Sequence, residues 1–138
     1  MQDKKLIAFD LFDTCMEFTI TKPQENQEYD KLFANLGILE RKREIQKILL
    51  TTNRDIENII KDMIPGTNID DFLKIYYQHI KKELASVELF PETKNTLSKI
   101  RDKGYKIAVI SNISKPYTQA LYRLLPYIFD YEVLSCNV

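Results

Sequence analysis

The sequence predicts an α/β fold in which a parallel sheet carries an inserted block of helices. Three short apolar runs end abruptly at polar residues, as the strands of a buried parallel sheet do. A segment with helical periodicity separates the second run from the third, and this alternation places parallel strands side by side. The segment between residues 24 and 84, by contrast, shows only helical patterns.

The three predicted strands are Leu6–Phe9, Tyr105–Ile110 and Tyr131–Leu134. Asp10 directly follows the first strand, and Ser111 directly follows the second. We expect the first strand to be buried and to present functional side chains at its carboxyl end, because open parallel sheets bind their ligands at that edge.

Helices are expected on both sides of the second strand. Pro91 is well placed to open one that runs to Lys103, and apolar residues at helical spacing from Tyr117 predict another that Pro126 ends. Four successive apolar stripes between residues 24 and 84 predict four more helices.

The helical block is therefore expected inside the α/β unit, after its first strand. Residues 1–20 and 86–138 are predicted to form the α/β core, and residues 21–85 are predicted to form a helical cap.

Composition excludes several classes of protein. Lys plus Arg and Asp plus Glu both number 20, so the chain has no overall field that would attract nucleic acid or an anionic membrane. No apolar run approaches the roughly 18–20 residues that span a bilayer, and the run after the N-terminal MQDKK is too short for a signal peptide. We expect a cytoplasmic protein that binds a small molecule and neither nucleic acid nor membrane.

Scarce residue types exclude several kinds of site. The three glycines, Gly37, Gly66 and Gly104, are scattered singly, which excludes a Rossmann dinucleotide fingerprint and a P-loop. The single histidine, His79, excludes His-based zinc sites and a Ser-His-Asp triad. Cys15 is expected to be a small buried residue rather than a reactive thiol. Carboxylates, hydroxyls and lysines must therefore carry any chemistry.

The first candidate motif is the sequence FDLFDT, in which Asp10 stands at the tip of the first strand. The following turn directs backbone N–H groups into the same space and forms a cradle for an anion. A carboxylate there can attack phosphorus or carbon, and water can then hydrolyse the covalent intermediate. The alternative interpretation is an aspartate that caps a turn.

The second candidate motif is Ile110-Ser111-Asn112, at the tip of the second predicted strand. Its hydroxyl and amide can hold a phosphoryl or carboxylate oxygen, although Ser-Asn is also ordinary in turns. Because the two motifs frame the helical block in order, together they favour a shared site.

In these motifs the sequence resembles the haloacid dehalogenase-like (HAD) hydrolase superfamily, in its subfamily with a helical cap after the first strand. The first family motif is an apolar strand ending in Asp-x-Asp-x-Thr, matched here at Asp10 and Thr14, and the second is matched at Ser111. Residues 89–112 also resemble the family's stretch leading into its second motif. The resemblance implies a Rossmann-like parallel sheet with three strands present of the usual five.

The resemblance implies a hydrolase that acts on a small phosphorylated or halogenated metabolite. Asp10 would be the nucleophile and a magnesium ligand, with the backbone carbonyl of Phe12 as a second ligand. Thr14 would steady the loop, while Ser111 and Asn112 would bind an oxygen of the transferred group. The implied cofactor is Mg²⁺ for phosphoryl chemistry and none for dehalogenation.

One departure concerns the leaving group. Phe12 replaces the family's second Asp, whose acid–base work is typically worth about 10²–10⁴-fold, and Asp13 is expected to project elsewhere. Dehalogenases lack that Asp because a halide leaves without a proton. Arg41 lies 31 residues after Asp10, a spacing resembling that of the dehalogenase arginine, so 2-haloacid dehalogenation is an alternative function. Arg41 is otherwise an exposed helix residue, and Phe18 is a candidate for substrate specificity.

The second departure concerns the end of the sequence. The family's remaining motifs, a lysine and an acidic pair, are expected after a strand resembling the one that begins at Tyr131. The resemblance thus implies a truncated chain whose first strand has an open edge, which invites a second copy or a completing chain. A truncated or degenerate fold that acts as a binding or assembly module is therefore the alternative to an enzyme.

Overall fold

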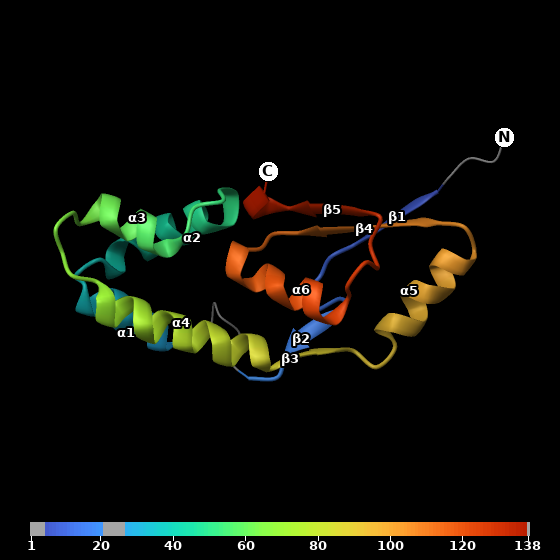
Figure 1. Ribbon diagram of the computed structural model, residues 1–138, viewed down its shortest axis with the longest axis horizontal. Helices are drawn as coiled ribbons and strands as arrows, with labels where there is room; N and C mark the ends of the chain where they lie inside the picture. Colours follow the sequence, from blue (N-terminus) through green and yellow to red (C-terminus); the bar gives the residue numbers. More distant parts are fainter. Residues whose placement is uncertain (1–4, 21–26, 138) are drawn as a thin grey trace.

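The apolar runs of the sequence form a three-stranded parallel sheet. The computed structural model describes residues 5–20 and 27–137 (Figure 1). Its sheet has the order β1-β4-β5, with β1 spanning Leu6–Phe9, β4 spanning Lys106–Ser111 and β5 spanning Tyr131–Leu134. The α/β class is confirmed, as are the bounds of the first and third strands, and the second lies one residue further along than predicted.

Helices α5 (Thr93–Asp102) and α6 (Thr118–Leu124) lie on one side of this sheet (Figure 1). The 3₁₀ turn η3 (Lys115–Tyr117) precedes α6. Apolar side chains of both helices join those of β4 and β5 in one buried cluster, which includes Leu97, Val109, Leu121 and Leu134. Burial of this cluster is what holds the helices on the sheet.

The other side of the sheet remains open in the described part of the chain. By strand register, Leu6, Ile110, Tyr131 and Val133 share that side, and they are 56%, 51%, 56% and 48% exposed. We call these four side chains the outer face. The prediction that the first strand is buried is therefore wrong, because the helices cover one face of the sheet and β1 alternates between half-buried and exposed residues.

In its described residues, 27–85, the cap contains four α-helices, as the four apolar stripes predict. They are α1 (Gln27–Asn35), α2 (Lys42–Thr51), α3 (Ile56–Met63) and α4 (Asp70–Ala85), and the 3₁₀ turn η2 (Leu39–Arg41) precedes α2. The four helices gather at one end of the molecule (Figure 1). Their apolar stripes meet in a second buried cluster, whose members include Phe33, Ile45, Ile60, Phe72 and Ile80.

A short antiparallel ribbon connects the cap to the rest of the chain. Its strands are β2 (Met16–Phe18) and β3 (Val87–Leu89). Beside it, the amide and hydroxyl of Thr19 both donate to the Ser86 carbonyl, at 3.0 and 2.7 Å. The sequence analysis did not predict this ribbon, because strands of three residues are too short to show a period.

The two buried clusters support the proposed division into a core of residues 1–20 and 86–138 and a cap of residues 21–85. Of these ranges, residues 1–4, 21–26 and 138 lie outside the described residues. Across residues 5–20 and 27–137, none of the helices combines the length and the apolar character that crossing a membrane requires.

Candidate functional site

Asp10 and Ser111 lie at the same edge of the sheet. Asp10 directly follows β1 and Ser111 is the last residue of β4; because these strands are adjacent and parallel, both residues stand at their carboxyl ends. Asp10 is exposed, and its Oδ1 accepts a hydrogen bond from the Leu11 amide at 2.8 Å. Ser111 is buried, with 6% of its surface exposed. This edge is the candidate reaction site.

The turn after β1 is held by its own backbone. The Leu11 carbonyl accepts hydrogen bonds from the amides of Thr14, Cys15 and Met16, at 3.4, 2.8 and 3.3 Å. Asp13 donates its amide to the Met16 carbonyl at 2.7 Å. Thr14 itself is exposed and contributes to the turn through this amide. The chain after Asp10 is therefore a tight, hydrogen-bonded loop.

A cavity of about 400 Å³ lies where this turn, the loop after β4 and the cap meet. Its volume is within the range of small-molecule sites. Of the residues that the structure describes, six aromatic ones line it: Phe12, Phe18, Tyr29, Phe33, Tyr76 and Tyr117. Five polar residues of this described part also line it: Asp13, Lys42, Gln46, Asn112 and Ser114. We call it the junction cavity.

The candidate residues from the sequence divide between the cavity and its border. Phe12, Phe18 and Asn112 line the junction cavity, whereas Asp10, Thr14 and Ser111 are not among its lining residues. The latter three belong to the adjacent sheet edge and turn. Their proposed roles remain predictions.

Arg41 does not reach the junction cavity. Its guanidinium pairs with the Glu44 carboxylate, with 3.0 Å between Nε and Oε2, and this pair raises the pKa of Arg41. The next residue, Lys42, does line the cavity, and its Nζ pairs with the Asp30 carboxylate. Arg41 and Lys42 point to different sides because neighbouring residues of a helix turn do not share a face.

Asp13 corrects an expectation from the sequence. It was expected to project away from the site, but it lines the junction cavity beside Phe12. Its φ of 65° lies in the left-handed region, which aspartate tolerates better than most residues. The unusual backbone conformation redirects the side chain, and the alternation of an extended strand cannot predict it.

Three aromatic rings form a continuous wall across the junction. The ring of Phe12 stacks on that of Phe18, with centroids 4.7 Å apart and planes 12° apart. The ring of Phe18 meets the edge of Tyr117 at 5.9 Å and 85°. The residue two places after Asp10 is therefore an apolar group fixed by packing.

A buried carboxylate joins the cap to the core beside this wall. Glu83, at the end of α4, is 1% exposed and accepts hydrogen bonds from the hydroxyls of Tyr29 and Tyr117, the latter at 3.2 Å. Burial raises the pKa of both tyrosines far above the usual value, and their contacts with Glu83 raise it further. Tyr29 lies on α1 and Tyr117 in η3, so these bonds connect cap and core.

The sequence analysis missed Lys42, Glu83 and Asp13 as site residues. Glu83 carried a usable signal, because it follows Tyr76 and Ile80 at helical spacing on an otherwise apolar stripe. Lys42 stood in a charged run that gave no indication of which member faces inward.

Cys15 is buried, as predicted, and lies directly beside the candidate nucleophile. Its Sγ donates to the Asp10 carbonyl at 3.4 Å. Burial, and secondarily the charge of Asp10, raise the pKa of the thiol to about 11. The thiol is thus protonated at neutral pH and is not a nucleophile there.

Comparison with known proteins gives a family match over almost the whole chain. The family described as haloacid dehalogenase-like hydrolase matches residues 9–136. No curated protein matches the chain.

Solved structures with the same fold include a predicted phosphoglycolate phosphatase from Haemophilus somnus 129pt (17% identity, TM-score 0.55, covering 100% of this chain and 65% of that chain). A predicted HAD-like family hydrolase from Porphyromonas gingivalis matches at 20% identity and a TM-score of 0.57, over 97% of this chain and 67% of that one. A HAD-family enzyme from Bacteroides thetaiotaomicron, in complex with magnesium and inorganic phosphate, matches at 15% identity and a TM-score of 0.53. This match covers 96% of this chain and 69% of that chain. At these identities the likeness shows the fold alone, and this chain spans about two thirds of each structure.

Proposed function

Because the chain belongs to the haloacid dehalogenase-like hydrolase family, we propose that it hydrolyses a small phosphorylated metabolite through attack by Asp10. One observation carries this proposal. Asp10 and Ser111 end adjacent parallel strands at one edge of the sheet, and the turns that follow them line a cavity large enough for a metabolite.

The proposed reaction has two steps. A carboxylate oxygen of Asp10 forms a bond to phosphorus while the bond from phosphorus to the leaving oxygen breaks, and that oxygen departs with the electron pair. Water then attacks the phosphorus of the aspartyl phosphate, and the bond to Asp10 breaks. The attacking water loses a proton to solvent, so the products are inorganic phosphate and the original carboxylate.

The neighbouring groups would stabilise the phosphoryl oxygens during both steps. The Ser111 hydroxyl and the Asn112 amide are donors at or next to this edge. The turn after β1, which contains Thr14, uses the amides of residues 13–16 in its own backbone hydrogen bonds, so its proposed role is to position Asp10 rather than to cradle the anion as the sequence suggested. Donors aimed at developing charge lower the barrier because they need no reorganisation. The proposed roles follow from this position and from the family match.

Magnesium fits the donors that the chain offers. Asp10 is exposed and Phe12 adds a backbone carbonyl, and both are the hard oxygen ligands that Mg²⁺ prefers. Within residues 5–20 and 27–137, no group of three His, Cys, Asp or Glu side chains could hold a metal ion. Water and phosphate would therefore complete the shell, as Mg²⁺ accepts, and the bound ion would neutralise charge on the phosphoryl oxygens.

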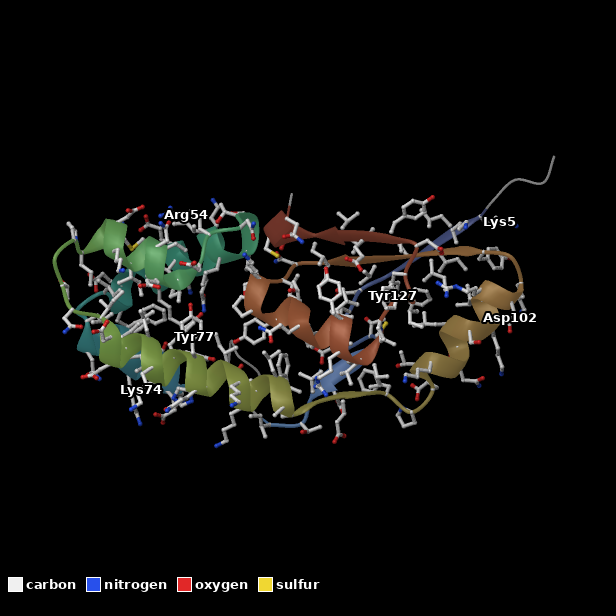
Figure 2. The ribbon with its side chains drawn as sticks, viewed as in Figure 1. Lys5, Arg54, Lys74, Tyr77, Asp102 and Tyr127 are labelled. Atoms are coloured by element: carbon white, nitrogen blue, oxygen red, sulfur yellow. The ribbon has the colours of Figure 1, made fainter. Side chains whose placement is uncertain are left out.

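The test is turnover of a panel of phosphate monoesters and 2-haloacids, each with and without Mg²⁺. Asp10→Asn should lower any turnover by at least about 10³-fold, since it removes the nucleophile. Asp102→Asn is the matched control, because Asp102 ends α5 at the far end of the molecule from the cap (Figure 2). Undiminished turnover in Asp10→Asn would refute the mechanism, and halide release without phosphate release would favour dehalogenation.

The outer face favours a second candidate function, assembly with a second copy of the chain. Four exposed apolar side chains share this face, and in the described part of the chain no strand pairs with the free edge of β1. An unpaired edge can pair with its own copy about a two-fold axis, and a formal net charge of zero gives two copies no overall repulsion.

Light scattering after size-exclusion chromatography tests this second candidate. We expect a dimer that Ile110→Lys shifts toward monomer, whereas Lys74→Glu on the cap (Figure 2) leaves it unchanged. A monomer at every concentration would overturn this candidate and would leave the hydrolase proposal intact.

A further inference from the structure

We infer that the junction cavity binds a flat aromatic leaving group, so that the substrates are aryl phosphate monoesters. This inference rests on the proposed phosphohydrolase function and names its substrate class. It begins from the cavity's lining among the residues that the structure describes, where six aromatic residues stand beside five polar ones. Rings prefer offset-stacked or edge-to-face contacts with other rings, and such pairs gain more than their buried area alone provides.

The aromatic walls come from both sides of the junction. Phe12 and Phe18 belong to the turn after β1 and to β2, and their stacked rings continue through Tyr117 of η3. Phe33 on α1 and Tyr76 on α4 complete the lining from the cap. A flat ring entering the cavity would therefore meet aromatic side chains of both core and cap.

Two of the tyrosines offer the cavity rings rather than hydroxyls. The hydroxyls of Tyr29 and Tyr117 are both bonded to the buried Glu83 carboxylate. A sugar or other polyol would need polar partners for each of its hydroxyls, because burying a polar group without a hydrogen bond is costly. Because the hydroxyls of Tyr29 and Tyr117 already donate to Glu83, neither is available to donate to a polyol in the cavity.

The polar lining residues give the ligand a direction. Asp13, Asn112 and Ser114 follow the strands β1 and β4, at the edge where Asp10 stands. On the cap side, Lys42 is already paired with Asp30. A phosphoryl group at the sheet edge would therefore place its ester substituent among the rings.

The chemistry of the leaving oxygen also favours an aryl ester. Phe12, two residues after Asp10, is held by its stack with Phe18 and has no proton to give. A phenol has a pKa of about 10, whereas the conjugate acid of an alkoxide has a much higher pKa, close to that of bulk water. A phenolate therefore leaves without a proton donor far more readily than an alkoxide does.

Binding of 2-naphthol tests the ring site without any turnover. The chain contains no tryptophan, so the ligand's own fluorescence can be followed. We expect 2-naphthol to bind, and its saturated counterpart decahydro-2-naphthol to bind roughly 3–10-fold more weakly, as lost ring contacts imply. Equal affinity for the two compounds, or no binding of either, would overturn the inference.

Three variants locate this binding. Phe18→Leu replaces a ring by an apolar side chain and should weaken 2-naphthol binding by about 3–10-fold, and Phe33→Leu should weaken it in the same way from the cap side. Tyr127→Asn is the control, because Tyr127 is 99% exposed, lies between α6 and β5 away from the cap, and has a φ of 59° that asparagine tolerates (Figure 2). Weakening by Tyr127→Asn alone would overturn the inference.

Turnover of phenyl phosphate against cyclohexyl phosphate separates this inference from the function on which it rests. We expect kcat/KM to be higher for phenyl phosphate by at least about 10²-fold, because an alkoxide leaving group loses the rate gain that a general acid would supply. Equal turnover, with Asp13→Asn slowing only the cyclohexyl ester, would show that Asp13 protonates the leaving group and would overturn the substrate class alone. Binding of 2-naphthol in the cavity with no ester hydrolysed would overturn the hydrolase function and leave the ring site.

Discussion

Two adjacent residues define the chemistry beside Asp10. Phe12 supplies a ring that packs on Phe18, and Asp13, whose backbone is left-handed, lines the junction cavity. The FDLFDT motif suggested Asp10 as a nucleophile, but it could not show where Asp13 points. That direction depends on a single φ angle, which the turn's hydrogen bonds impose.

Replacing Phe12 by aspartate should change the preference for leaving groups. A carboxyl two residues after Asp10 can donate a proton to an alkoxide, so Phe12→Asp should raise the cyclohexyl-to-phenyl ratio of kcat/KM by about 10-fold or more. The measurement is steady-state phosphate release from both esters. Phe12→Leu, which also loses the ring and its stack on Phe18 but adds no carboxyl, is the matched control and should raise the ratio less than Phe12→Asp does; an equal change in both variants would contradict the prediction.

Cys15 should make the stability of the protein depend on alkaline pH. Burial raises the pKa of its thiol from 9.0 to about 11, so between these values the unfolded chain loses a proton that the folded chain keeps. The free energy of unfolding should be insensitive to this group below pH 9 and fall by on the order of 2 kcal/mol by pH 11.

Urea unfolding between about pH 8 and pH 10 follows this loss before the raised pKa values of Tyr29 and Tyr117 add to it. Burial also raises the pKa of Cys136, so the contribution of Cys15 is the difference between the unchanged protein and a Cys15 variant. The Cys15→Ala variant should show a flatter dependence on pH. Identical slopes in the two proteins would contradict the role given to the thiol.

At the scale of elements, the long apolar patterns predicted the structure well. The apolar runs predicted strands β1 and β5, and helical periodicity predicted the four cap helices. The ribbon of β2 and β3 could not be predicted, because each strand is only three residues long and the whole cap separates the two strands along the sequence. Burial of β1 was predicted wrongly because an apolar run does not reveal whether helices cover one face of a sheet or both.

The bond between Tyr117 and Glu83 should stabilise the contact of cap and core. Tyr117→Phe removes one of the donors to a buried carboxylate, so it should lower the free energy of unfolding by about 1–3 kcal/mol. Tyr122→Phe is matched to it, because Tyr122 donates to Glu132 at 2.9 Å on the exposed surface and should cost less than about 0.5 kcal/mol. Equal losses in urea unfolding would show that burial of the pair contributes nothing.

At the scale of the whole molecule, the candidate site lies where the core and the cap meet. One hydrophobic cluster lies under the sheet and another inside the cap, and the junction cavity takes its lining from both units. The order of the motifs along the sequence correctly implied a helical block between the two strand ends. The sequence could not show that Lys42, rather than Arg41, reaches the cavity, because this choice depends on how α2 is rotated against the sheet edge.

The most direct measurement is mass spectrometry of the protein quenched in acid during turnover of phenyl phosphate with Mg²⁺. The account predicts one phosphoryl group on the peptide that contains Asp10, absent from Asp10→Asn and removed by hydroxylamine, as an acyl phosphate must be. A phosphoryl group on Ser111 or Ser114 instead, or labelling that persists unchanged in Asp10→Asn, would contradict it.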